Sequence, residues 1–256
     1  MNGTLISWTD STWNPTTGCT KVSAGCDHCY AMDLSLRFGW SKHPWTKEFE
    51  AENVICHPGR LDKPRKFKPG TRCFVNSMSD LFHPLVPDAF IHDVFRVMVE
   101  CPQVTFQILT KRPARAAKWT GPWAPNIWMG TSVENDAALF RVDYLRKCAA
   151  QTRFLSCEPL LGPLTGINLD GIHWVIAGGE SGRHITREPE RVMRHEWARE
   201  LRDTCVSDEV AFFFKQISGV RTEMGNKLIE ADGSETVWEQ FPDHRPSVAA
   251  PLRLAV

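Results

Sequence analysis

From residue 72 onward, short runs of β-branched and aromatic residues alternate with longer stretches of helical periodicity. The short runs predict strands at residues 72–77, 104–110, 126–132, 153–157, 172–177 and 209–214. Helical periodicity is clear in residues 88–100, 135–150 and 187–205, and a shorter helical stretch occupies residues 114–119. Alternation of this kind is typical of a parallel sheet or barrel made of β/α units.

A further short strand at residues 5–8 would precede these runs and give six or seven parallel strands in total. We therefore predict an α/β fold, a partial TIM-like (β/α)6–7 parallel barrel that spans residues 1–219. Residues 40–71 break the alternation and are predicted to form a proline-containing, locally basic insertion. Residues 220–256 are predicted to be a peripheral C-terminal extension. A length of 256 residues with 42% hydrophobic content suits one large domain.

Charge and cysteine usage narrow the classes of protein to consider. The formal net charge is zero, so any contact with nucleic acid or an anionic membrane would need a local patch. The first residues lack a charged and then apolar leader pattern, and no apolar run approaches membrane-spanning length. We therefore expect a cytoplasmic protein without membrane association. Nine cysteines, an odd number, favour reduced thiols or metal ligands over a disulfide framework.

Three of these cysteines lie close together, in a loop that would follow the first strand. Cys19, Cys26 and Cys29 have C-x6-C-x2-C spacing, and the neighbouring glycines and proline indicate irregular backbone. A structural zinc ion would need a fourth ligand, whereas a four-iron cluster with three thiolates keeps one iron open for a small molecule. The expected position of the loop at a barrel mouth favours the cluster. The candidates for a fourth zinc ligand are His28, His43 and Cys56.

Each predicted strand is followed at once by polar side chains. Because the carboxyl ends of parallel strands meet at one mouth of a barrel, these residues would share a pocket with the cysteine loop. For Asp80 or Ser132 alone, a helix-cap or loop role is the simpler interpretation, and Glu158 with Lys215 equally fits a buried structural ion pair. The residues that we single out are Ser77, Asp80, Lys111, Ser132, Glu134, Glu158, Glu180 and Lys215.

The cysteine loop, NPTTGCTKVSAGCDHCYA over residues 14–31, resembles the cluster loop of radical S-adenosylmethionine (SAM) enzymes, especially their spore photoproduct lyase-like branch. Its first gap has six residues, where that pattern usually has three. The ordered motifs SMSDLFHPLVP, QILTKRP, GTSVEN, SCEPLLGPL, VIAGGESG and FFFKQ resemble a phage- and mobile-element-associated family of three-cysteine, radical-SAM-like proteins. This resemblance runs from about residue 8 to about residue 219 and is specific because the whole set occurs in order.

The resemblance implies that Cys19, Cys26 and Cys29 ligate a [4Fe-4S] cluster whose open iron binds SAM. Reductive cleavage of SAM would give methionine and a 5′-deoxyadenosyl radical that abstracts hydrogen from a substrate. The electron would come from an external flavodoxin- or ferredoxin-like donor. The implied cofactor-binding residues are Ser77 or Asp80 for the SAM amine, Lys111 for the methionyl carboxylate and Ser132 for the carboxylate or the ribose. His28 and Tyr30 would lie near the adenine or methionyl group, and Glu134 is a further cofactor-binding residue.

The resemblance leaves Glu158, Glu180 and Lys215 for the substrate. Cys157 would donate hydrogen to a product radical, although a buried strand cysteine is the simpler interpretation.

The resemblance favours a nucleobase or nucleotide substrate, such as a modified pyrimidine in phage DNA. The basic run at residues 59–72 would contact phosphates, although solvated surface charge is the commoner explanation of such a run. Stacking surfaces for bases, or else core residues, are Trp40, Trp45, Trp119, Trp123 and Trp128. The alternatives are a zinc-stabilised nucleic-acid-binding module without catalysis, and a scaffold that assembles the cluster but has lost catalysis.

Overall fold

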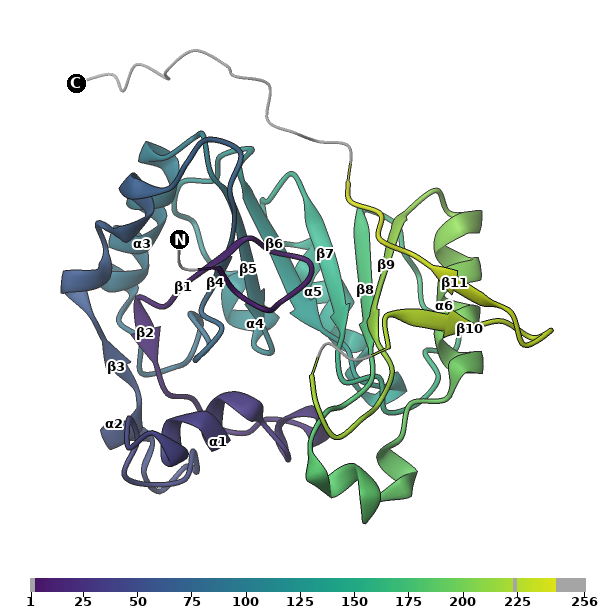
Figure 1. Cartoon of the computed structure of the whole chain (residues 1–256). Helices are drawn as coiled ribbons and strands as arrows, with labels where there is room; N and C mark the ends of the chain where they lie inside the picture. Colours follow the sequence, from purple (N-terminus) through teal and green to yellow (C-terminus); the bar gives the residue numbers. More distant parts are fainter. Residues whose placement is uncertain (1–2, 223–224, 243–256) are drawn as a thin grey trace.

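A computed structural model describes residues 3–222 and 225–242 of the chain. Its centre is a seven-stranded, all-parallel sheet that curves into a half-barrel (Figure 1). In spatial order, which is also chain order, the strands are β1 (Ser11–Trp13), β4 (Arg72–Val75), β5 (Thr105–Thr110), β6 (Ile127–Ser132), β7 (Arg153–Cys157), β8 (Trp174–Gly178) and β9 (Ala211–Gln216). The prediction of parallel β/α units is therefore confirmed.

Six strands lie where the sequence predicted them, within two residues at each end, and the first does not. The expected strand at residues 5–8 is wrong, because that segment is a turn, in which the Thr9 amide donates to the Ile6 carbonyl at 3.2 Å. The edge strand is β1 instead, which pairs with β4 in register Ser11 to Cys73. The apolar character of residues 5–8 has another cause: Trp8 is buried against Phe74, with ring centroids 4.7 Å apart.

The helices pack on the convex side of the sheet, where they form the larger of two cores. They are α3 (Asp88–Glu100), α4 (Pro113–Ala116), α5 (Phe140–Arg146) and α6 (His195–Ser207). The apolar stripe of α3 repeats every three or four residues, as an amphipathic helix requires, and buries Phe90, Ile91, Val94 and Phe95. Between β7 and β8 there is no helix in residues 158–173, and Leu164, Ile167 and Leu169 fill that part of the outer core.

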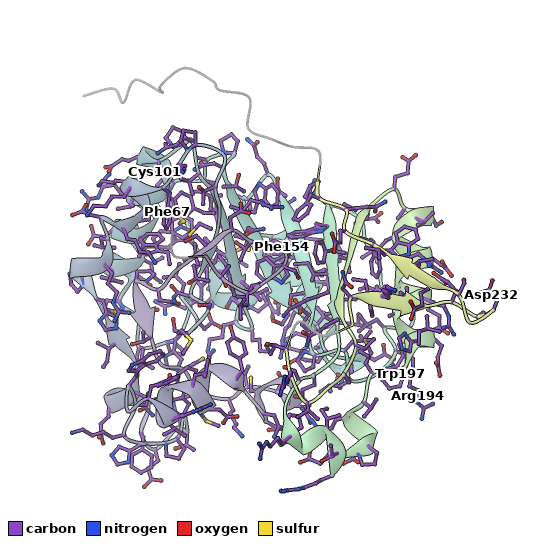
Figure 2. All side chains as sticks on the ribbon, viewed as in Figure 1. Phe67, Cys101, Phe154, Arg194, Trp197 and Asp232 are labelled. Carbon is purple, nitrogen blue, oxygen red and sulfur yellow. The ribbon has the colours of Figure 1, made fainter. Side chains whose placement is uncertain are left out.

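The second core fills the concave side, near the amino-terminal ends of the strands. We call it the aromatic floor; it consists of Trp8, Phe74, Trp128, Phe154, Trp174 and Phe213. Phe154 lies at the centre of the molecule (Figure 2), and its ring closes over Gly130 on the neighbouring strand. A Cβ at Gly130 would come within 2.4 Å of that ring, so only glycine fits there. The interior of the half-barrel is thus packed at its base.

Two segments outside the β/α rhythm cover the free edges of the sheet. The insertion after α1 (Tyr30–Arg37) contains α2 (Glu50–Asn53) and β3 (Ile55–Cys56), which pairs with β2 (Thr16–Thr17). Its Lys63 and Arg60 then protect the β1 edge, where Lys63 donates to the Thr12 carbonyl at 2.7 Å and the Arg60 carbonyl accepts from the Trp13 indole at 2.8 Å. The remaining short 3-10 turns are Ala24–Cys26, Pro58–Arg60, Lys63–Lys66, Asp136–Ala138, Arg183–Thr186 and Pro189–Arg191.

The C-terminal segment is more than the peripheral extension that the sequence predicted. After the hairpin of β10 (Lys227–Ile229) and β11 (Glu235–Val237), the chain runs antiparallel along β9. The Phe214 amide donates to the Trp238 carbonyl at 2.7 Å, and the Gln240 amide donates to the Phe212 carbonyl at 3.0 Å. Leu228 is fully buried in the outer core. Residues 225–242 therefore belong to the domain and cover the β9 edge of the sheet. The rest of the predicted extension, residues 223–224 and 243–256, lies outside the described residues.

None of the helices in the described part of the chain is long and apolar enough to cross a membrane.

Candidate functional site

The alternation of side chains along the strands brings four polar residues together above the aromatic floor. Residues an even number of positions apart share a face of a strand. Lys111, Ser132, Glu158 and Lys215 therefore lie on the concave side, because they follow concave-side residues of the same strands at even spacing. Two contacts confirm the placement: Lys111 Nζ donates to Ser132 Oγ at 3.2 Å, and Lys215 Nζ lies 3.0 Å from Glu158 Oε1. We call this set the mouth residues.

Lys111 stands out among the mouth residues. Its side chain is half-buried and its ammonium donates to the hydroxyl of Ser132. Within residues 3–222 and 225–242, no carboxylate lies within ion-pair distance of it. Its charge also acts on the cysteine loop, where it partly opposes the rise in the pKa of Cys29 that burial causes. A partly buried cation without an anionic partner is suited to bind an anionic ligand group.

The cysteine loop lies at the carboxyl ends of the strands, where it contacts Glu134 and Arg112, and α1 begins directly after it (Figure 1). Cys19, Cys26 and Cys29 are half-buried free thiols. Burial raises the pKa of Cys29, while backbone N–H groups of Met32 and Ala31 and the charge of Lys111 act in the opposite direction. These groups only partly offset the effect of burial, so the pKa of Cys29 stays above its ordinary value; the form that ligates iron or zinc is the thiolate.

The described residues include no group of three His, Cys, Asp or Glu side chains placed to hold a single metal ion. One tetrahedral zinc would draw its thiolates to within about 4 Å of one another. The expected fourth ligands for zinc also have other partners. His28 Nε2 lies 2.9 Å from Glu188, His43 Nε2 lies 3.3 Å from Glu52, and Cys56 belongs to β3.

Glu134 anchors the six-residue segment between Cys19 and Cys26. Its carboxylate is buried, pairs with Arg141 at 2.7 Å and accepts a hydrogen bond from the Ser23 hydroxyl. Gly25 rests on the same side chain: a Cβ there would lie 2.4 Å from Glu134 Cγ. The six-residue gap is thus seated on the end of β6. The resemblance implied a direct cofactor contact for Glu134, whereas here both of its oxygens are engaged within the protein.

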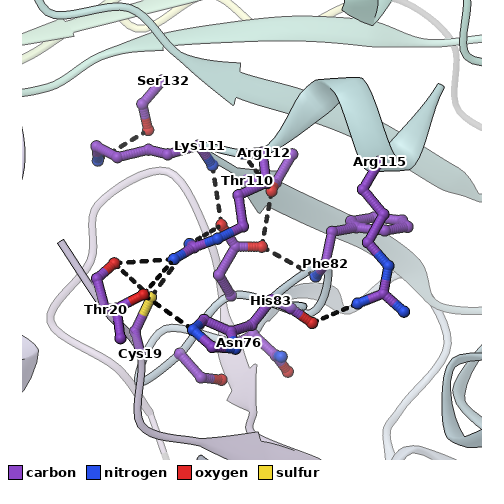
Figure 3. Close-up of polar contacts among 12 residues, drawn as sticks. Cys19, Thr20, Asn76, Phe82, His83, Thr110, Lys111, Arg112, Arg115 and Ser132 are labelled. Carbon is purple, nitrogen blue, oxygen red and sulfur yellow. Dashed lines mark hydrogen bonds and ion pairs between the residues drawn. The ribbon is translucent and has the colours of Figure 1, made fainter. Parts of the chain in front are cut away.

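Asp80 is likewise engaged by the protein. Its Oδ1 accepts from the Thr110 hydroxyl at 2.7 Å and the Phe82 amide at 2.9 Å, and its Oδ2 accepts from the Lys111 amide at 3.0 Å and from Arg112 at 3.1 Å (Figure 3). These four bonds shape the turn after β5, which aims Lys111 toward Ser132. Asp80 therefore positions the site, and we no longer expect it to receive the SAM amine. Ser77 exchanges hydrogen bonds with the Asn14 side chain.

Glu180 and Arg191 tie the cysteine loop to the segment after β8. Glu180 is buried and forms a two-pronged ion pair with Arg191, at 2.6 and 2.7 Å, and also contacts His184 at 3.1 Å. Arg191 also donates to the Ala24 carbonyl in the loop at 3.0 Å. His28 stacks on His184 with ring centroids 3.6 Å apart. Glu180, which the resemblance left for the substrate, is thus engaged within the protein here, and His28 packs on the same segment.

Glu158 and Lys215 form the ion pair that the sequence left as an alternative to a substrate role. Ser156 donates to Glu158 Oε2 at 3.2 Å, and Gly178 leaves room for the pair, since a Cβ there would lie 3.1 Å from Glu158 Oε1. Tyr30 lies close by and donates to the Ser77 carbonyl at 2.9 Å. Tyr30, the first residue of α1, thus ties the chain directly after the cysteine loop to the segment that follows β4.

Cys157 is not at the mouth. It is fully buried in the outer core, where Cys205 of α6 is close enough to interact with it electrostatically. It follows Leu155 at even spacing and therefore points to the convex side, opposite to Ser156 and Glu158. The role as hydrogen donor is accordingly withdrawn, and the simpler interpretation of a buried strand cysteine applies.

The surfaces expected to contact nucleic acid are mostly used within the chain. Of the basic run, Arg60 and Lys63 bond to backbone carbonyls, Arg65 pairs with Asp62 and Glu100, and Arg72 pairs with Asp10. Among the five tryptophans, Trp45 and Trp128 are buried and Trp119 and Trp123 pack on the outer core, which leaves Trp40, 64% exposed, as the accessible ring.

Three arginines that hold the site had no role assigned from the sequence. Arg112 contacts the first cysteine, Arg141 fixes Glu134, and Arg191 fixes Glu180. A signal was present only for Arg112, which directly follows Lys111 at a strand end. The other two lie seven and eleven residues beyond the carboxylates that they pair with. Only the folded structure shows that each of these two arginines contacts its carboxylate.

Comparison with curated proteins and with solved structures gave no match. One family model does match, over residues 3–242, and its description is "Protein of unknown function (DUF5131)". Because this match covers nearly all of the chain, including the cysteine loop, the mouth residues and the segment along β9, the protein belongs to the DUF5131 family.

Proposed function

We propose that this protein is a radical SAM enzyme in which Cys19, Cys26 and Cys29 hold a [4Fe-4S] cluster. One observation carries the proposal: three free thiols in one loop lie at the carboxyl ends of a parallel half-barrel, beside a lysine that has no carboxylate partner among the described residues. In barrels of β/α units, this end of the sheet is where active sites form. The proposal extends the motif resemblance, which covers the same residues.

When bound, the cluster and SAM would supply the electron transfer and the radical chemistry. The residues of the chain would bind and orient. Lys111, whose ammonium donates to the Ser132 hydroxyl, would pair with the carboxylate of SAM. The aromatic floor below closes the interior to water, and water exclusion protects reactive species from quenching.

For the substrate we propose a nucleobase or nucleotide that contacts the Glu158–Lys215 pair. Both side chains are partly accessible, at 14% and 17%, so a ligand with donors and acceptors can reach them. The expected electron donor is flavodoxin- or ferredoxin-like, and the reduced thiols suit a cytoplasmic location.

Anaerobic reconstitution with iron and sulfide, followed by an assay of 5′-deoxyadenosine from SAM and dithionite, tests the proposal. The unmodified protein should turn brown, bind iron and sulfide in equal amounts and produce 5′-deoxyadenosine. A variant with all three loop cysteines changed to alanine should show none of these three properties. Cys56→Ser is the matched control, because this half-buried cysteine lies in β3, beside the loop but outside it, and it should behave as the unmodified protein does.

Each failure has its own meaning. Retention of one zinc per chain, lost in Cys56→Ser, would replace the proposal with the zinc-stabilised module. A stable cluster without 5′-deoxyadenosine, in the presence of nucleotides and single-stranded DNA, would indicate a scaffold that has lost catalysis. Lys111→Gln should bind the cluster yet lose most SAM cleavage, whereas Lys118→Gln, an exposed lysine after the same turn, should lose none.

A further inference from the structure

The side chain of Arg112 lies between a carboxylate and the first cysteine of the loop. Its Nη1 is 3.1 Å from Asp80 Oδ2 and 3.4 Å from Cys19 Sγ, and its Nη2 donates to the carbonyl and the hydroxyl of Thr20, both at 2.9 Å (Figure 3). The side chain is only 12% exposed. One guanidinium thus directs an N–H group at a ligand sulfur and fixes the next residue of the loop.

We propose that Arg112 is a positioning residue that sets the reduction potential of the cluster through its hydrogen bond to Cys19. The inference rests on the proposed function, because it concerns the group that the three thiolates would hold. Hydrogen bonds to ligand sulfurs and the net charge around a cluster are the means by which a protein adjusts its potential. A donor that is also a permanent cation acts in one direction: it stabilises the more negative, reduced state and makes the cluster easier to reduce.

The surroundings of Cys19 explain why such a donor is needed. Cys19 Sγ and the buried carboxylate of Asp80 both contact the same Arg112 Nη1, at 3.4 and 3.1 Å, so the guanidinium separates the two groups. Without Arg112, the sulfur of Cys19 would face a buried carboxylate with no cation between them. Asp80 in turn accepts from Arg112 and so fixes where its N–H groups point.

The neighbouring Arg115 provides a matched control. It follows Arg112 by three residues and also ties α4 to backbone carbonyls, donating to His83 and, at 2.7 Å, to Val86. It makes no hydrogen bond to any of the three loop cysteines. Loss of Arg115 therefore tests the structural contribution of an arginine at this turn, without changing the environment of a ligand sulfur.

The experiment is a redox titration of the reconstituted protein, followed by electron paramagnetic resonance, for the unmodified chain, Arg112→Met, Arg112→Lys and Arg115→Met. In Arg112→Met we expect the affinity of the cluster for its electron to fall about tenfold, which lowers the midpoint potential by about 59 mV. Arg112→Lys keeps the charge and should shift by less. Arg115→Met should not shift.

The outcomes separate this inference from the proposed function. If the unmodified protein binds no cluster, the proposed function fails and this inference fails with it. If the cluster forms and both Arg112 variants keep the original potential, the inference alone is overturned. Loss of the cluster in both Arg112 variants, with retention in Arg115→Met, would also overturn it, because Arg112 would then serve assembly instead of the potential.

Discussion

Along β8, Trp174 at the start of the strand packs among aromatic rings, whereas Gly178 at the end of the same strand lies beside the Glu158–Lys215 ion pair. The same contrast holds around the half-barrel. The aromatic floor contains no charged side chain, and the mouth residues include three. The first part of each strand thus contributes to the packed core, and the carboxyl end contributes to the candidate site. Substitutions in the aromatic floor should mainly lower stability, whereas substitutions of the mouth residues should mainly lower activity.

The largest effect on stability is expected at the floor. Trp174 is fully buried and lies 5.6 Å from Phe154 and 6.2 Å from Phe213, by ring centroids. Trp174→Ala should lower the free energy of unfolding by about 3–5 kcal/mol, because it leaves a cavity in a packed core. Urea denaturation of the cluster-free protein measures this. The exposed Trp40 is the control, and Trp40→Ala should stay within about 0.5 kcal/mol; equal effects would show that the floor is not a packed core.

A second large effect is expected from pH, through a histidine beneath the loop. Burial, with a smaller contribution from the charge of Arg112, lowers the pKa of His83 to about 4 from 6.5. Between these values the unfolded chain binds a proton that the folded chain does not. Stability should therefore be complete above pH 6.5 and fall by roughly 3 kcal/mol as the pH drops to about 4.

Urea midpoints measured across this pH range test the contribution of His83. His83→Gln should remove most of the slope, because glutamine cannot take up the proton. His92→Gln, at an exposed position of α3, should preserve it. A slope that is unchanged in His83→Gln would assign the acid sensitivity to other groups.

At the junction of the loop and the mouth, an intermediate effect is expected from a single methyl group. Gly25→Ala places a Cβ against Glu134, which Arg141 holds in place. We expect a loss of about 1–3 kcal/mol from overpacking, together with a lower iron content after reconstitution because the loop moves. Gly59→Ala, where nothing lies within 4 Å of the new Cβ, should change neither quantity. Full iron content in Gly25→Ala would show that the loop adapts.

The smallest effect on stability should accompany a large effect on activity, at the mouth. Lys111→Gln removes a half-buried charge that donates to one hydroxyl, so its free energy of unfolding should change by less than about 1 kcal/mol. SAM cleavage should fall roughly tenfold or more, from the 1.5–3 kcal/mol that a hydrogen bond to a charged group contributes. If the stability fell as much as in Trp174→Ala, the division of the half-barrel into floor and mouth would not hold.

Local patterns were enough to predict most of the fold. Residues 153–157 form β7 as expected, and 88–100 form α3, because their periodicity and their flanking turn residues are local properties. The strand at 5–8 was misplaced because the apolar residues there serve the aromatic floor, through Trp8, and are not part of a β-ladder. Residues 225–242 were judged peripheral because a short, polar hairpin carries no sign of the strand that it will cover.

The candidate site was likewise only partly predictable from the sequence. The sequence by itself determined the three cysteines, their common loop and the polar residues that follow each strand, because composition and spacing show these directly. It did not determine which face each residue takes: both faces of a parallel sheet are buried, so Cys157 and Ser156 look equally suited to the mouth. Nor did it determine the partners. Only the tertiary structure decided which arginine pairs with which carboxylate, since an ion pair depends on where two segments meet. The pairs are Arg112 with Asp80, Arg141 with Glu134, and Arg191 with Glu180. The position of Lys111 beside the cysteine loop, with no carboxylate within ion-pair distance among residues 3–222 and 225–242, is therefore visible only in the folded chain.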